Sequence, residues 1–296
     1  MKKLLNIDGG GVRVYFSLLI LKYIEKKTNK KITDIFDFYS GVSASAIILS
    51  GLLTKYSIDE MLNLFKDISY NIFYRSYYYT FTSGFGIFNS KYPESNINNE
   101  LQKLLGEHKM NDIIKPLTLL SYDLHTNKPV YFQSYNNDIS NNDLWKIVRG
   151  SASAPTYFSP FNLDDMTLID GGVVTNNLSE IIFLNALDYF GKDEEFFQLS
   201  VGTGTYNYKF TQPPSGLWSW GGPIIDIFFL ASSKYEMTAL KNISKYENLK
   251  QFHRIDIELE EDITLDDCYA FDKMDLIFEI WLEKNKDYLD KICLEL

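Results

Sequence analysis

The sequence predicts an α/β fold, a three-layer α/β/α sandwich around a mostly parallel central sheet. Short apolar runs alternate along the chain with stretches of helical periodicity, which is the pattern of strands joined by crossover helices. Several of these runs stop at glycine-rich turns, and ligands of such sheets bind beyond the carboxyl ends of the strands. The chain has 296 residues, 45% of them hydrophobic, so it can bury a core without disulfides or metal ions. We expect a single domain over residues 1–296, with its motifs within residues 4–205.

The first half of the chain contains two predicted strands and three predicted helices. Residues 4–7 form an apolar run that stops at Asp8 and three glycines, and residues 36–39 form an aromatic run that stops at residues 40–41. Residues 44–53 are small or apolar all round, as in a buried helix. Two further helices are predicted where apolar residues recur at helical spacing: Phe16, Leu19, Ile20, Tyr23 and Ile24, and then Ile58, Met61, Leu62, Phe65 and Ile68.

The second half of the chain repeats the alternation. Strands are predicted at residues 117–122 and 130–134, which a loop connects, and at residues 168–169 and 196–201, which both end in glycine-rich turns. Helical signals resume at Ser179. A C-terminal helix over about residues 270–296 is expected to close the domain, because Met274, Ile277, Trp281, Tyr288 and Ile292 share helical spacing.

Charge and composition exclude several classes of protein. The net charge of −10 and a pI near 4.9 argue against nucleic-acid binding, which needs a basic footprint. Two cysteines, Cys268 and Cys293, are too few for a disulfide framework or a four-cysteine zinc site and are expected to be reduced thiols. The N-terminus lacks the apolar region of a secretory signal, and no stretch approaches 18 uncharged apolar residues. We expect a cytoplasmic protein, peripheral to a membrane at most.

The first candidate for chemistry is Ser43, in the pentapeptide Gly41-Val42-Ser43-Ala44-Ser45. It lies between an apolar run and a buried helix, which is the context of a nucleophile elbow. Such a sharp turn needs small residues two positions before and after the serine, and Gly41 and Ser45 meet that need. The helix that follows directs its N–H groups toward a reacting carbonyl. Taken alone, the pattern fits a structural turn better than catalysis.

The second candidate is the loop Asp8-Gly9-Gly10-Gly11-Val12-Arg13. Three consecutive glycines allow backbone N–H groups to approach a negative charge, either a phosphate or a developing oxyanion. A plain strand-to-helix turn does not need three glycines. The loop is not a P-loop, because no Gly-Lys-Ser or Gly-Lys-Thr follows it.

The third candidate is Asp170, which begins Asp170-Gly171-Gly172 at the end of a predicted strand. A carboxylate in this position could act as the base for Ser43. By itself the tripeptide is explained better as an ordinary Asp–Gly turn.

Together these segments resemble the patatin-like phospholipases. The resemblance rests on the glycine-rich loop at residues 8–13, the elbow at 41–45, and the Ser-Ala-Ser-Ala-Pro-Thr-Tyr-Phe segment at 151–158. It also includes Asp170-Gly171-Gly172 with Asn176-Asn177, and the strand at 199–204. A looser similarity continues at Phe252-His253-Arg254-Ile255. The segments occur in the order found in that family, and this order makes the resemblance specific.

The resemblance implies a Ser–Asp dyad instead of a catalytic triad. Ser43 would attack an ester carbonyl to form an acyl-enzyme, and Asp170 would take the serine proton and later activate a water. The N–H groups of Gly9, Gly10 and Gly11 would form the oxyanion hole, and Arg13 would stabilise the same charge or hold the loop. No metal or organic cofactor is implied. The chain departs from the family pattern at Ser45, where glycine is common, and at Val14, where a glycine often follows the arginine.

The expected activity is hydrolysis of lipid acyl esters, of the phospholipase A or lysophospholipase type, and three alternatives remain. His253 follows Ser43 and Asp170 in an order that allows a triad, although it alternates with Ile255 and Ile257 as a core residue would. A phosphate- or nucleotide-binding protein would use the glycine-rich loop but would leave the elbow unexplained. A patatin-like module could bind lipid without turnover, or hydrolyse it only with an activator.

The aromatic segment at residues 70–92 suggests where a lipid surface could bind. It has ten aromatic residues, Arg75 and Lys91, and no acidic residue. Tyrosine favours half-wet interfaces, so the segment could be a lid or a face for transient contact with a membrane. Aromatic helices packed in the core explain the composition equally well. The expected partners are therefore a phospholipid or other lipid ester, a membrane surface, and an activating protein that the sequence does not identify.

Overall fold

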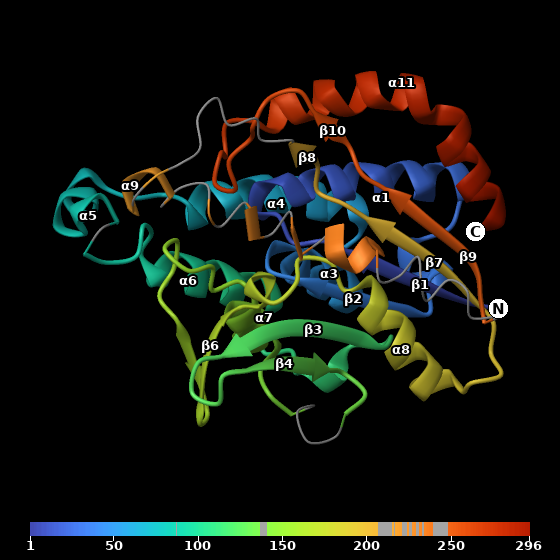
Figure 1. Cartoon of the computed structure of the whole chain (residues 1–296), viewed down its shortest axis with the longest axis horizontal. Coiled ribbons are helices and arrows are strands. Elements are labelled where there is room, and N and C mark those ends of the chain that lie inside the picture. The colour runs from blue at the N-terminus through green and yellow to red at the C-terminus, as the bar shows by residue number, and fades with distance from the viewer. Residues whose placement is uncertain are drawn as a thin grey trace.

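The computed structural model describes residues 1–86, 88–136, 141–206, 215, 217–220, 224, 227–228, 231–232, 234–238 and 248–296. Its centre is an eight-stranded sheet in the order β5-β6-β3-β2-β1-β7-β9, with β4 also paired to β3 (Figure 1). Strands β3, β2, β1, β7 and β9 are parallel to one another, whereas β4, β5 and β6 are antiparallel to their neighbours. The strands are β1 (Lys2–Ile7), β2 (Phe38–Val42), β3 (Leu117–Asp123), β4 (Lys128–Gln133), β5 (Phe161–Leu163), β6 (Met166–Asp170), β7 (Phe196–Val201) and β9 (Leu249–Ile255). A two-stranded sheet pairs β8 (Thr205–Tyr206) with β10 (Glu258–Leu259).

Helices cover both faces of the large sheet, as the three-layer prediction requires. Because successive side chains of a strand point to opposite faces, Leu5 and Ile7 join the larger core and Leu4 joins the smaller one. The larger core lies beneath α1 (Val14–Thr28), α3 (Ala44–Thr54), α4 (Ile58–Ile72), α6 (Glu94–Leu105), α7 (Leu144–Ser151) and α11 (Phe271–Glu295). The smaller core lies beneath α8 (Ser179–Phe190). The described residues also include the short helices α2 (Ile32–Ile35), α5 (Tyr77–Thr82) and α9 (Leu217–Trp220).

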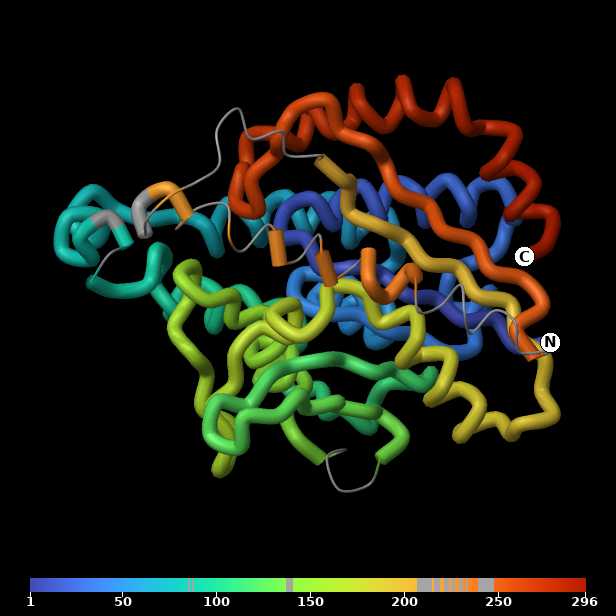
Figure 2. The backbone as a smooth tube through the Cα atoms, viewed as in Figure 1, coloured from blue at the N-terminus to red at the C-terminus, as the bar shows by residue number. Residues whose placement is uncertain are grey.

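Helix α4 illustrates how the local sequence sets these elements. Ser57 caps its N-terminus in a reciprocal capping box with Glu60, and the apolar residues that predict the helix are buried. The C-terminal helix α11 packs along α1, and Lys3 Nζ donates a hydrogen bond to the Leu296 carbonyl, so the two termini lie together at one end of the molecule (Figure 2). In the part of the chain that is described, no helix has the length and apolar character needed to cross a bilayer.

Two strands of the sheet meet end to end along one edge of β3. Strand β4 occupies the other edge of β3 from Thr118 to Asp123, so β2 and β6 share the remaining edge. Strand β2 ends with Val42 opposite Leu120, and the oppositely directed β6 ends with Asp170 opposite Ser121. The residue that follows β2 and the last residue of β6 are thereby brought next to each other.

Candidate active site

Ser43 occupies a sharp turn between β2 and α3. Its backbone angles are φ 60° and ψ −130°, a conformation that side-chain-bearing residues rarely adopt. Ser43 is the N-cap residue of α3, so it precedes the first helical residue, Ala44. A Cβ at Gly41 would lie 2.6 Å from Ser45 Oγ, so the position two before the serine has no room for a larger residue. The local geometry is that of the elbow which the sequence predicts.

Two other serines fix this turn to the sheet. Ser45 Oγ accepts a hydrogen bond from the Val42 N–H at 2.8 Å and lies 2.9 Å from the Ile7 carbonyl, to which it can donate. Ser151 Oγ accepts the Ser43 N–H at 3.1 Å and donates to the Leu120 carbonyl at 2.7 Å. The departure from glycine at position 45 therefore adds a buried tie between the elbow and β1.

Asp170 is completely buried beside the elbow. Its Oδ1 accepts the Gly172 N–H at 2.7 Å, whereas Oδ2 is buried and has no hydrogen-bond partner among the described residues. Burial raises the pKa of Asp170 to about 7, and the nearby Ser43 hydroxyl and the Gly172 N–H offset only part of that rise. A carboxyl group with this pKa can both accept and return a proton near neutral pH.

A buried arginine supports the segment beneath Asp170. The Arg149 guanidinium donates to Ser153 Oγ, to Asn98 Oδ1 at 2.8 Å and to the Ser159 carbonyl at 3.2 Å. Burial lowers the pKa of Arg149 to about 10. The Ser153 carbonyl in turn accepts the Asp170 N–H at 3.0 Å, so Arg149 holds the chain that positions the acid.

The glycine-rich loop follows β1 and reaches the same place. The Gly9 carbonyl accepts hydrogen bonds from Asn176 Nδ2 at 2.6 Å and Thr203 Oγ1 at 3.0 Å. Because a trans peptide places its N–H opposite its carbonyl, the Gly10 N–H points away from these two side chains. The Gly9 N–H is already donated to the Asn176 carbonyl at 3.1 Å, whereas the N–H groups of Gly10 and Gly11 have no acceptor among the described residues.

Close packing explains why this loop needs glycines. Gly11 has φ 55°, and a Cβ there would lie 2.1 Å from the Leu265 carbonyl oxygen. That carbonyl accepts the Val12 N–H at 2.9 Å, so the loop is also tied to the C-terminal part of the chain. Arg13 ends the loop, and its Nε is buried without a partner in the described structure.

Asp8 is anchored by Arg254, a residue whose role no sequence motif predicts. Arg254 Nη1 and Nη2 donate to the two oxygens of Asp8 at 2.9 and 2.7 Å, and Nη2 also reaches Asp256 at 2.7 Å. The two carboxylates raise the pKa of Arg254 against the opposing effect of burial. Composition is the sequence signal that could have indicated a special role for Arg254, because this chain has four arginines and 25 lysines.

His253 faces the other side of β9. Its Nε2 lies 2.7 Å from Glu295 Oε2 on α11, and its ring packs on Phe197 with centroids 5.4 Å apart. Strand alternation directs the next residue, Arg254, toward Asp8 and directs His253 toward α11. The structure therefore places His253 away from Ser43 and Asp170, and a triad that includes it has no geometric support.

An apolar cavity of about 50 Å³ opens beside Ser43. Its polar end includes Gly11 and Ser43, and the rest of its wall is almost entirely aliphatic and aromatic. The wall residues come from α3, α4 and the residue that follows it, α6, the segment after α7 and the Leu265 loop: Ala44, Ile47, Phe65, Ile68, Ser69, Ile72, Phe73, Ile97, Ala152, Ala154, Tyr157, Phe158 and Leu265. Such a wall suits an acyl chain. Within the described residues, no cluster of three or more histidines, cysteines or acids could hold a metal ion.

Comparison with known proteins assigns the family. Residues 5–182, more than half of the chain, match the family model described as patatin-like phospholipase, and the chain belongs to that family. It is 24% identical to Patatin-like protein 4 of Arabidopsis thaliana, over 89% of this chain and 78% of that protein. It is 26% identical to a cGAMP-activated phospholipase of Escherichia coli, over 90% of this chain and 84% of the relative. The crystal structure of VipD from Legionella pneumophila matches 94% of this chain and 67% of that one, with 12% identity and a TM-score of 0.42.

Proposed function

We propose that this chain hydrolyses acyl esters of phospholipids, as a phospholipase A or lysophospholipase, through an acyl-enzyme on Ser43. The observation that carries the proposal is the pairing of a strained serine with a buried acid whose second oxygen has no hydrogen-bond partner among the described residues. An apolar cavity beside the serine supports a lipid acyl chain as the substrate group. We further propose that residues 1–296 act as one catalytic domain, because residues before and after position 182 contribute to the site.

The proposed reaction has two halves. In the first, ionised Asp170 takes the hydroxyl proton while Ser43 Oγ attacks the ester carbonyl carbon, and protonated Asp170 then gives the proton to the departing alcohol oxygen. In the second, a water loses a proton to Asp170 and attacks the acyl-serine carbonyl. The bond between the acyl carbon and Ser43 Oγ then breaks, and Asp170 returns the proton to Ser43 Oγ, which releases the fatty acid and restores both residues.

The oxyanion formed in both halves needs hydrogen-bond donors. We assign this role to the N–H groups of Gly10 and Gly11, because Gly9, the third predicted donor, already donates to Asn176. Each such donor typically lowers the barrier by roughly 3 kcal/mol. Arg13 lies at the end of the same loop and would add positive charge.

The test is fatty-acid release from vesicles of phosphatidylcholine and phosphatidylglycerol in the presence of EDTA. We expect wild type and His253→Ala to release fatty acid, and Ser43→Ala and Asp170→Asn to release none. A fluorophosphonate that labels reactive serines should modify wild type and fail to modify Ser43→Ala. Activity that survives Ser43→Ala, or that EDTA removes, would contradict the mechanism.

An activator-dependent enzyme is the second candidate function. The cavity is far smaller than the several hundred Å³ typical of ligand pockets, so a lipid chain has to widen it. One relative is named for activation by cGAMP. If wild type is inactive alone but gains Ser43-dependent activity with an added nucleotide or protein, this candidate is supported. Lipid binding without any turnover would instead indicate a non-catalytic module.

A further inference from the structure

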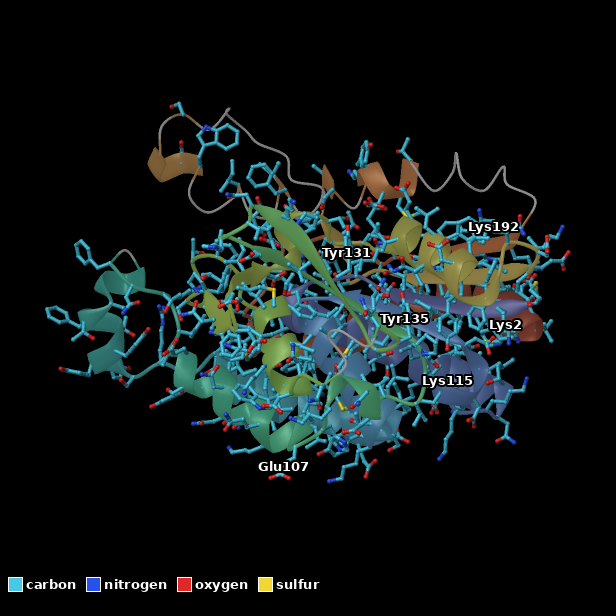
Figure 3. The ribbon with its side chains drawn as sticks, turned by 90° about the horizontal axis from the view of Figure 1, so that it is seen from below. Lys2, Glu107, Lys115, Tyr131, Tyr135 and Lys192 are labelled. Atoms are coloured by element: carbon cyan, nitrogen blue, oxygen red, sulfur yellow. The ribbon has the colours of Figure 1, made fainter. Side chains whose placement is uncertain are left out.

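Residues 74–86 and 88–90 form an arm that projects from one end of the molecule, and we name it the aromatic arm. It contains α5, which lies at the end of the long axis opposite the C-terminus (Figure 1). The view from below shows the same projection, with aromatic side chains directed away from the body of the protein (Figure 3). None of the six residues of α5 is buried.

The large aromatic side chains of the arm are unusually exposed. The exposed fraction is 97% for Tyr77, 80% for Tyr78, 78% for Phe81 and 86% for Phe88. Tyr77 and Phe81 are four residues apart and so lie on one face of α5. A group of rings this exposed leaves much apolar surface in water and is typical of an interaction surface.

Charge on the arm is as unusual as its exposure. The chain carries 39 acidic residues, yet residues 68–93 contain none. The nearby cations already have partners, since Lys91 pairs with Asp266 and the Arg75 guanidinium lies 5.7 Å from the centre of the Tyr92 ring. The arm therefore carries no negative charge that an anionic surface would repel, and it offers rings more than free positive charge.

The base of the arm forms part of the cavity wall. Phe73, which lines the cavity, packs on Tyr92 with ring centroids 5.1 Å apart. Where the chain returns from the arm to the body of the protein, the N–H groups of Lys91 and Tyr92 donate to the carbonyls of Thr156 and Tyr157 at 2.9 and 3.0 Å. Tyr157 also lines the cavity. If the arm binds to a surface, the cavity and Ser43 therefore lie close to that surface.

We propose that the aromatic arm docks the protein on a phospholipid bilayer by inserting its exposed rings among the headgroups. The proposal rests on the proposed function, because a lipid hydrolase has to reach substrate packed in a membrane. Tyrosine and phenylalanine rings partition to this interface, where an apolar body and a polar tip are both accommodated. Since the rings and not free cations make the contact, binding should persist at high salt, where repulsion of the acidic body is screened.

The experiment measures co-sedimentation with vesicles of equal parts phosphatidylcholine and phosphatidylglycerol. All proteins carry Ser43→Ala, so that binding is independent of turnover. The arm variant is Tyr77→Ser, Tyr78→Ser and Phe81→Ser, which leaves Tyr79 and its hydrogen bond to the Ser90 carbonyl intact. The matched control replaces three exposed apolar residues of α11 with serine: Leu276, Ile280 and Leu294.

We expect the arm variant to bind vesicles at least about tenfold more weakly than the parent, and the α11 control to stay within about twofold. With Ser43 restored, the arm variant should hydrolyse a monomeric short-chain ester at the rate of wild type. The docking proposal is overturned if the parent does not bind, if the arm variant binds equally well, or if the α11 control loses as much. It is also overturned if the parent is a dimer that the arm variant dissociates, because the arm would then join two copies. Failure to hydrolyse the short-chain ester in wild type would instead contradict the proposed function.

Discussion

Replacing Asp170 with asparagine should stabilise the folded protein above neutral pH while it abolishes the proposed hydrolysis. Burial raises the pKa of Asp170 from 3.8 to about 7, so the folded state holds this proton more tightly than the unfolded chain does. At about 1.4 kcal/mol per pKa unit, keeping the ionised carboxylate buried costs roughly 4 kcal/mol above pH 7. Asparagine retains the acceptor for the Gly172 N–H and carries no charge.

The size of this effect depends on pH. Because the pKa is higher in the folded state, the stability of wild type falls relative to Asp170→Asn as pH rises from about 4 to about 7. Below this window the two proteins should be similarly stable. For a chain of this length, 4 kcal/mol corresponds to about 6 °C in the melting temperature. This is an upper value, since the new amide N–H groups also need acceptors.

Urea unfolding of both proteins, below about pH 4 and above about pH 8, measures the difference directly. Asp123 provides a control, because its pKa is shifted in the opposite direction from that of Asp170. Burial alone would raise its pKa, but hydrogen bonds from Thr126, His125 and Thr167 lower it to about 2. Asp123→Asn should therefore destabilise the protein at neutral pH, and wild type should lose this advantage as pH falls toward 2. An equal stability difference for Asp170→Asn at both pH values would refute the assignment of Asp170 as a buried, titrating acid.

Three further substitutions test the supports of the site. Ser45→Ala should lower the free energy of unfolding by about 1–3 kcal/mol, because a buried N–H of the elbow loses its acceptor. Arg254→Lys should cost about 1–3 kcal/mol and lower kcat, because an ammonium cannot make the paired hydrogen bonds to Asp8. Arg149→Lys should cost roughly 2 kcal/mol, because a lysine cannot reach Ser153 and two further acceptors together. Urea unfolding measures all three, and ester hydrolysis measures the effect on kcat.

Each of these substitutions leaves Ser43, Asp170 and the glycines of the loop themselves unchanged. Unchanged stability in Ser45→Ala would mean that the elbow holds its shape without this tie. If Arg254→Lys kept both stability and kcat, the bidentate contact would not be what orders the glycine-rich loop. If Arg149→Lys reduced stability but left the pH profile of hydrolysis unchanged, its role would be structural and not that of a positioning residue for Asp170.

Local patterns in the sequence predict most of the strands and long helices. The apolar runs at residues 4–7 and 196–201 lie within β1 and β7, and the spacing that starts at Ile58 predicts α4. The aromatic segment is a different case, because composition leaves its burial open and only the structure shows that α5 is exposed. Short elements with little periodicity, such as β5, give no signal of their own.

Contacts between distant parts of the chain could not be predicted in this way. Asp170 meets the elbow because β2 and β6 end at adjacent residues of β3, and this register depends on the whole sheet. Arg254 lies 246 residues from Asp8, and nothing near either residue indicates the pairing. A sequence motif identifies the groups that carry chemistry, whereas the groups that hold them in position are dispersed along the chain.

The part of the chain that matches the family model is shorter than the part that is needed to complete the central sheet. The segment recognisable by family, residues 5–182, ends before β7, the strand that pairs with β1 along its whole length. A fragment cut at that boundary would turn β1 into an unprotected sheet edge, which is a template for aggregation. It would also lack Arg254 beneath the glycine-rich loop and Leu265 beside it. For cloning, grafting or tracing recombination in such proteins, the smallest transferable unit therefore extends well beyond the stretch that carries the signature.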